Sequence, residues 1–246
     1  MDDRTPTTGA PVGRWPALCA IAVVVLTLSA CGSSSSPGAS ATSKAADLAL
    51  ARKSLIVLGD LPSGWTQSGR VSSGSGSGNS LPTAKVAACL GVPRSEINTS
   101  WPTENSPTFN DAADESTVTD QVETFPNAAK AATDFSTFSN AKTPGCFQSV
   151  LGPLLRKDAQ NGAGTGATVG TVTTTRRPFP AVGDESGDIE IQVPITTPSI
   201  STSLYVDLVV ITEGRLETTL SLTSPGTPFG ATLAQQVAAA AVRRMS

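Results

Sequence analysis

The segment 188–195, DIEIQVPI, decides the fold, because every second residue in it is a branched apolar one. Successive side chains of a strand point to opposite faces of a sheet, so this alternation places apolar side chains on one face and polar ones on the other. It predicts a strand of an antiparallel sheet with one buried and one wetter face. The segments 204–211 (LYVDLVVI) and 215–222 (RLETTLSL) follow, and Thr212-Glu213-Gly214 between them predicts a hairpin connection.

Upstream of these strands, apolar residues recur at three- and four-residue steps, which predicts helices in segments 126–138 and 143–155. A proline near the start of each segment suits a first helical turn, and Pro228 predicts the beginning of a last helix in the same way. Shorter helices are expected at 44–53 and 84–90, and a strand at 115–125. Because the helices cluster before the strands, the sequence predicts an α+β fold, an antiparallel sheet of four to six strands with helices packed on one face.

The N-terminal segment predicts export. Residues 17–30 are uncharged and mostly apolar, a length that suits the apolar region of a signal peptide better than a membrane span. Leu28-Ser29-Ala30-Cys31 resembles the lipobox of bacterial lipoproteins. The resemblance implies that Cys31 receives a diacylglyceryl group with acyl chains such as palmitate, and that residues 1–30 are removed. Two other interpretations are a signal peptide that releases the protein and an uncleaved signal anchor.

Three regions follow from this interpretation. Residues 1–30 form the lipoprotein signal peptide, and residues 31–43 form the lipidated cysteine with a Gly/Ser-rich linker. Residues 44–246 form a single soluble domain after this flexible tether. The whole chain has 17 basic and 20 acidic residues and no Lys/Arg-rich run, so we expect no nucleic-acid partner.

The four cysteines fit an oxidising compartment. Cys19 lies in the expected signal peptide and Cys31 takes the lipid, which leaves Cys89 and Cys146. Outside the cytoplasm such a pair is most simply a disulfide, and chain entropy gives roughly 4 kcal/mol for the loop it closes. The alternative, a two-cysteine metal site, lacks further ligands of that kind because the chain has no histidine. We therefore expect no metal and no cofactor.

A second resemblance concerns the start of the domain. Asp60-Leu61-Pro62-Ser63-Gly64-Trp65 resembles an Asp-Leu-Pro-x-Gly-Trp motif of secreted actinobacterial lipoproteins, a group without an established reaction. The general layout is also similar to the extracellular sensor domains of actinobacterial receptor kinases and to lipoproteins related to them. These resemblances imply a sensor-like module.

Candidate binding residues are few. Trp65 and Trp101 could line a ligand cleft, or lie at the edge of the core. Arg176 and Arg177 could bind an anion, or provide surface charge.

Two groups of carboxylates could perform acid–base chemistry or hold Ca²⁺, or they could be solvated turn residues: Asp111, Asp114 and Glu115, and Asp184, Glu185 and Asp188. The absence of histidine excludes a Ser-His-Asp or Cys-His nucleophile system. We therefore expect no enzyme, but a lipid-anchored binding or sensor-like module on the outer face of the cell membrane with an unknown envelope ligand or protein partner. The alternatives are an envelope hydrolase or transferase using Asp/Glu chemistry, and a lipid carrier.

Overall fold

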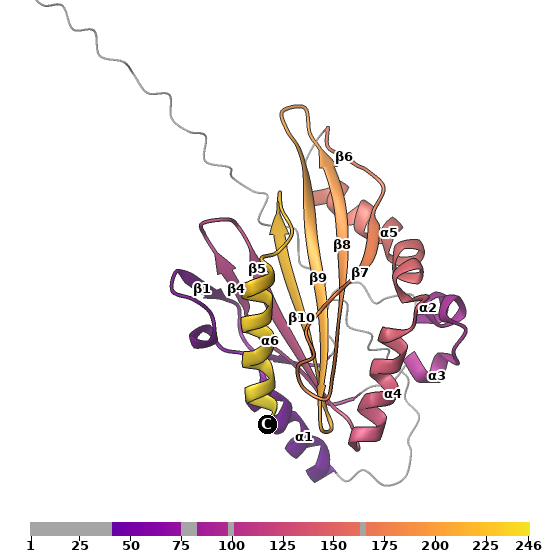
Figure 1. Ribbon diagram of the computed structural model, residues 1–246, viewed down its shortest axis with the longest axis vertical. Coiled ribbons are helices and arrows are strands. Elements are labelled where there is room, and N and C mark those ends of the chain that lie inside the picture. Colours follow the sequence, from indigo (N-terminus) through magenta and orange to yellow (C-terminus); the bar gives the residue numbers. More distant parts are fainter. Residues whose placement is uncertain (1–40, 75–82, 98–100, 163–165) are drawn as a thin grey trace, which may run out of the picture.

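The computed structural model describes residues 41–74, 83–97, 101–162 and 166–246. These residues form a large antiparallel sheet with helices packed against it (Figure 1). The helices are α1 (Ala41–Ser54), α2 (Thr83–Leu90), α3 (Arg94–Ile97), α4 (Ala128–Ser139), α5 (Thr143–Gly162) and α6 (Ala231–Met245), with a 3₁₀ turn η2 (Leu58–Asp60). The strands are β1 (Trp65–Ser68), β2 (Ser72–Ser73), β3 (Thr103–Asn105), β4 (Thr108–Asp111), β5 (Thr117–Thr124), β6 (Thr168–Val169), β7 (Thr173–Arg177), β8 (Glu185–Thr196), β9 (Ser201–Glu213) and β10 (Leu216–Pro225).

The sheet is organised around β8, β9 and β10, which are consecutive in the chain and adjacent in space. The main strand order is β1-β4-β5-β10-β9-β8-β6. Near each edge of the sheet, two short strands pair with one longer strand. On one edge β3 and β4 pair with different parts of β5, and on the other β6 and β7 pair with different parts of β8. The predicted connection after β9 is confirmed, and Gly214 adopts a positive φ of 57° there. A glycine tolerates this conformation because it has no Cβ.

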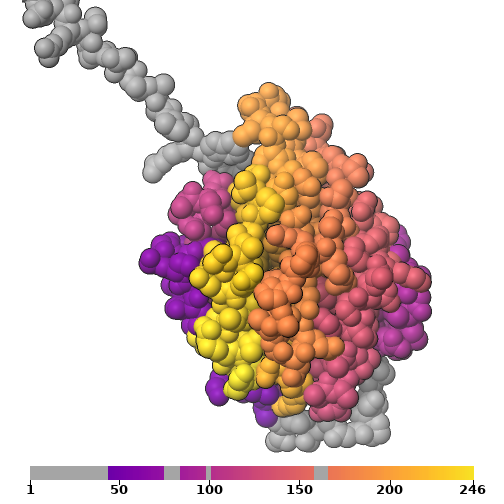
Figure 2. Space-filling model, viewed as in Figure 1, coloured from indigo at the N-terminus to yellow at the C-terminus, as the bar shows by residue number. Residues whose placement is uncertain are grey.

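Helices cover both faces of the sheet, which corrects the expectation that they cover one. The buried cluster under α1 and α6 contains Val209 and Ile211, whereas the cluster under α4 and α5 contains Leu208 and Val210. These four consecutive residues of β9 alternate between the faces, so the strand is buried on each side. In Figure 2 the chain between β7 and β8 (orange) fills the surface next to α6 (yellow). The α+β class and the antiparallel sheet are confirmed, with ten strands among the described residues in place of the expected four to six.

The predicted helices are present with small shifts at their starts. The helix after Pro126 begins at Ala128, because Asn127 is its N-cap and its side chain accepts a hydrogen bond from Lys130 N at 3.0 Å. The last helix begins at Ala231, with Gly230 as its N-cap. Both prolines therefore precede the N-cap rather than occupy the first turn.

The segment 60–65 joins the start of the domain to its last helix. Arg244 Nε of α6 donates to Asp60 Oδ2 at 2.5 Å, and Val57 N donates to the same oxygen at 2.8 Å. Gly64 has a φ of 102°, and Trp65 packs in the cluster under α6. The residues of the Asp-Leu-Pro-x-Gly-Trp motif therefore have a structural role in this domain. The signal peptide, Cys31 and almost all of the linker lie outside the described residues.

Candidate functional site

A pocket of about 50 Å³ lies between the sheet and helices α3, α4 and α5. Its walls combine acidic, amide and hydroxyl groups with aromatic and aliphatic side chains. Six elements contribute to it: Glu96 and Ile97 from α3, Gln121 and Glu123 from β5, Asp134, Thr137 and Phe138 from α4, Phe147 from α5, Leu208 and Val210 from β9, and Glu217 and Thr219 from β10. A small concave site with apolar walls and a few converging polar groups is typical of ligand pockets.

The floor of the pocket results from strand register. Glu217 of β10 lies opposite Glu123 of β5 on one side and opposite Thr212 of β9 on the other, and Thr212 lies opposite Glu185 of β8. Residues opposite one another in adjacent strands share a face of the sheet, so three glutamates form one row across four strands. The next row adds Gln121 opposite Thr219.

The roof of the pocket is α4. Its core-facing stripe includes Phe135 and Phe138, and Asp134 and Thr137 on the adjacent side line the pocket. Arg176 fixes the end of this helix, because its Nη2 donates to the carbonyl oxygens of Phe138 at 2.8 Å and Asn140 at 3.4 Å. Its guanidinium also lies over the Phe138 ring, 5.6 Å from the centroid. A cation at a helix C-terminus is favourable against the helix dipole.

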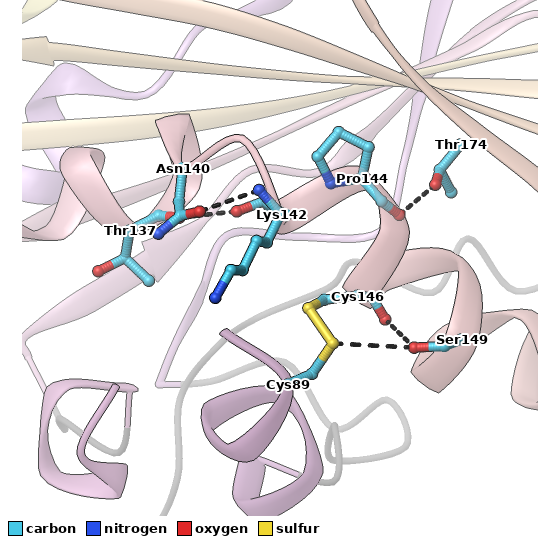
Figure 3. Close-up of a disulfide and its surroundings, with 9 residues drawn as sticks. Cys89, Thr137, Asn140, Lys142, Pro144, Cys146, Ser149 and Thr174 are labelled. Atoms are coloured by element: carbon cyan, nitrogen blue, oxygen red, sulfur yellow. Dashed lines mark hydrogen bonds between the residues drawn. A yellow bond between two sulfur atoms is a disulfide. The ribbon is translucent and has the colours of Figure 1, made fainter. Parts of the chain in front are cut away.

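The side wall is held by the Cys89–Cys146 disulfide, which the structure forms as expected (Figure 3). It links α2 to the first turn of α5, with 5.7 Å between the Cα atoms. Leu90 and Ile97 pack with Cys146 in one small buried cluster. The disulfide thus positions α3, whose Ile97 lines the pocket, against α5.

Two of the pocket carboxyl groups, those of Asp134 and Glu217, have raised pKa values and so retain their protons more strongly than ordinary acids. Burial raises the pKa of Glu217 well above its usual value, and repulsion from Asp134, Glu123 and Glu185 raises it further. Burial also raises the pKa of Asp134 to about 6, with Lys130 on the same helix acting in the opposite direction. Burial is thus the main cause of both raised pKa values, and the neighbouring carboxyl groups add to it at Glu217.

Two buried acceptors in the pocket have no hydrogen-bond partner. They are Glu217 Oε2 and Gln121 Oε1, on side chains that are 7% and 4% exposed. The amide nitrogen of Gln121 donates to Glu123 Oε1 at 2.9 Å. That bond leaves the Gln121 oxygen as the free end of the side chain. Buried polar atoms in proteins are nearly always hydrogen-bonded, so this pair calls for an explanation.

The four binding residues singled out in the sequence do not come together. Trp65 is buried in the cluster under α6. Trp101 contacts Phe125, with 5.5 Å between the ring centroids. Arg176 and Arg177 are neighbours in β7 and point to opposite faces of the sheet. Arg176 caps α4, whereas Arg177 binds carboxylates on the other face.

The two sets of acidic residues singled out in the sequence do not form binding sites of their own either. Asp111 Oδ1 and Asp114 Oδ1 accept backbone hydrogen bonds from residues two positions further on, which is the geometry of turn residues. In the second group, Asp184 Oδ2 accepts from Gly214 N at 2.8 Å in the turn after β9. Glu185 faces the pocket row, and Asp188 faces the opposite side of the sheet.

Asp188 belongs to an ionic cluster on the α6 face. Arg177 donates to Glu190 and Asp207, with nitrogen–oxygen distances of 3.1 Å in each ion pair. Asp188 Oδ1 has no hydrogen-bond partner. Burial raises the pKa of Asp188 to about 7 and that of Asp207 to about 6. Repulsion from Asp207 and Glu190 contributes to the rise at Asp188, and Arg177 opposes it. Three carboxylates thus lie near one guanidinium, which forms ion pairs with two of them.

Sequence reasoning missed the pocket residues Glu123, Asp134 and Glu217. The available signals were weak: Glu123 and Glu217 each occupy a polar position in an alternating strand, and Asp134 stands beside the apolar stripe of a helix. Within the described parts of the chain, no three Asp, Glu, Cys or His residues are arranged to hold a metal ion. None of the helices in those parts has the length and apolar character that a membrane crossing requires.

Fold and pocket together define a disulfide-linked α+β domain with an acidic pocket at one end of its sheet. No protein-family model matches the chain, and no curated protein matches its sequence. Among solved structures, the extracellular domain of PknH from Mycobacterium tuberculosis is similar. The TM-score is 0.44 and the identity 13%, over 79% of this chain and 93% of that one.

Proposed function

We propose that this chain is an extracytoplasmic binding domain, held at the cell membrane by a lipid on Cys31, that acts without catalysing a reaction. The disulfide supports the location, because disulfides persist in oxidising compartments and are rare in the cytosol. The sequence Leu28–Cys31 supports the anchor. Two or more acyl chains are enough for stable attachment to a bilayer.

The binding role rests on one observation: Glu217 and Gln121, which both line the pocket, each have a buried acceptor atom without a hydrogen-bond partner. A bound molecule that donates hydrogen bonds would satisfy both Glu217 and Gln121. The pocket also has apolar walls that could contact the rest of such a molecule.

The proposal is tested by thermal unfolding with a panel of small cationic, neutral and anionic compounds. A ligand present at 100 times its dissociation constant stabilises a domain by about 2.7 kcal/mol, which corresponds to about 5–10 °C here. Thr219→Phe should block the pocket and remove the shift, whereas Thr66→Phe, on the exposed β1, should not. If no compound of any class raises the unfolding temperature, the binding role is wrong.

The anchor is tested separately on native protein. Mass spectrometry should find Cys31 as a lipid-modified N-terminus, and the protein should enter the detergent phase of a Triton X-114 partition. Cys31→Ser should leave it in the aqueous phase. An unmodified Cys31 in membrane-extracted protein would contradict the anchor and leave the pocket proposal untouched.

Acid–base catalysis is the second candidate, and the raised pKa values of Asp134 and Glu217 favour it. Paired carboxyl groups in a pocket are the usual machinery of such chemistry. Turnover that both Asp134→Asn and Glu217→Gln abolish would establish it over simple binding. For a lipid carrier the pocket is too small, since about 50 Å³ holds a few water molecules and not an acyl chain.

A further inference from the structure

The pocket offers hydrogen-bond acceptors from several directions. Glu217 Oε2 and Gln121 Oε1 come from adjacent strands of the floor, and neither has a donor. The Asp134 carboxylate comes from the helix above. Among the described residues that line the pocket, none is a lysine or an arginine. The site is therefore rich in acceptors and poor in positive charge.

These features select a particular kind of ligand. An anion would meet repulsion from the acidic walls, and a neutral alcohol would leave the charge uncompensated. A metal ion requires several ligands at short range, and the described residues form no such group. A protonated primary amine is compact and carries three donors, which suits three converging acceptors in a volume of about 50 Å³.

We propose that the pocket binds the ammonium group of a primary amine, with Glu217, Gln121 and Asp134 as its acceptors. The inference rests on the binding role proposed above and specifies its ligand. Phe147 and Leu208, which also line the pocket, contact the methylene groups next to the nitrogen. The amine belongs either to a small molecule or to a lysine side chain, since both present the same group.

Binding is expected to depend on pH. An ammonium ion favours the charged form of each carboxyl group, so it displaces protons that the free pocket holds. Affinity therefore rises with pH through the range in which these groups titrate, by up to about tenfold per pH unit for one displaced proton. The charged groups that line this site, act on it or contact its walls are Glu217 of β10, Glu123 of β5, Glu185 of β8, Asp134 and Lys130 of α4, Glu96 of α3, and Arg176 of β7, which lies over the Phe138 ring.

The test is an NMR titration of the purified protein with butylamine, and with 1-butanol as its neutral analogue. Butylamine should bind, more tightly at pH 8 than at pH 5, and butanol should not. Glu217→Gln should weaken butylamine binding by about tenfold or more, the usual effect of losing a hydrogen bond to a charged group. Glu190→Gln removes a charge from the other face of the same sheet and should change little.

Gln121→Met provides a second variant, which removes an acceptor without changing charge and should also weaken binding. A blocked Gly-Lys-Gly peptide, titrated in parallel, identifies the source of the amine, because tighter binding of the peptide indicates a protein ligand. If butylamine fails to bind, or binds equally to Glu217→Gln, the ammonium inference is wrong. If butanol or butyrate binds instead, and Thr219→Phe prevents that binding, the pocket is a binding site as proposed but its ligand is not an amine.

Discussion

Asp188 provides the sharpest test of the electrostatics of this sheet. Its side chain is 4% exposed, Oδ1 has no hydrogen-bond partner, and Asp207 and Glu190 lie near it on the same face. Asp188→Asn keeps the shape and removes the charge. Arg177 retains its ion pairs to Glu190 and Asp207 in this variant. We expect the substitution to stabilise the protein at neutral and alkaline pH.

The size of the effect follows from the pKa of Asp188, which rises from 3.8 to about 7 on folding. An acid with a raised folded-state pKa binds its proton more tightly in the folded chain, so its cost is absent below about pH 4, grows between the two pKa values of 3.8 and about 7, and is constant above them. At 1.36 kcal/mol per pKa unit, the full cost at pH 8 is about 4 kcal/mol. Relaxation of the surroundings reduces such values, so we expect a gain of about 2–4 kcal/mol in the free energy of unfolding for Asp188→Asn.

Urea denaturation at pH 4, 6 and 8 measures this gain. For an m-value of about 2 kcal/mol per molar, the midpoint at pH 8 should rise by about 1–2 M, and the difference should disappear near pH 4. Asp184→Asn is the matched control, because Asp184 is exposed and its side chain accepts a hydrogen bond from the backbone of Gly214, in the turn after β9. Equal stability of wild type and Asp188→Asn at pH 8 would refute the reasoning, as would a gain that is the same at all three pH values.

Three further variants and one control test the packing. Replacing Cys89 and Cys146 with serine should lower the free energy of unfolding by about 4 kcal/mol, and reductant should then have no further effect in calorimetry. Leu220→Ala, at a fully buried site, should cost about 2–5 kcal/mol in urea. Gly183→Ala should destabilise by more than about 1 kcal/mol, since φ is +66° and a Cβ would lie 2.4 Å from the Thr212 carbonyl oxygen. Gly145→Ala meets no atom within 4 Å and should be close to neutral.

The class of fold could be predicted from the sequence because the spacing of apolar residues within each strand indicates which faces of that strand are buried. In β8 the alternation of apolar and polar residues corresponds to the two faces that the structure shows. The run Leu208–Ile211 in β9 carries a different signal, since four consecutive apolar residues indicate a strand covered on both faces. Applying the pattern of β8 to the whole sheet led to the expectation of helices on one face only.

The pocket could not be predicted because it depends on register. Glu123 and Glu217 are 94 residues apart in the chain and lie directly opposite one another in the sheet. No local pattern specifies which residues of two distant strands will be paired. The disulfide could be predicted from the sequence, because only Cys89 and Cys146 remained once Cys19 was assigned to the signal peptide and Cys31 to the lipid.

The two faces of β10 explain why a pocket with several carboxyl groups can exist in a stable domain. Leu216, Leu220 and Leu222 point into the cluster under α6, and Glu217 and Thr219 point into the pocket. The leucine face supplies burial that does not depend on the protonation of the pocket. Substitutions at Glu217 should therefore alter ligand affinity and its pH dependence while the sheet remains folded. The pocket can therefore contain charged carboxyl groups, because the energy needed to bury them is offset by the apolar packing on the opposite face of β10.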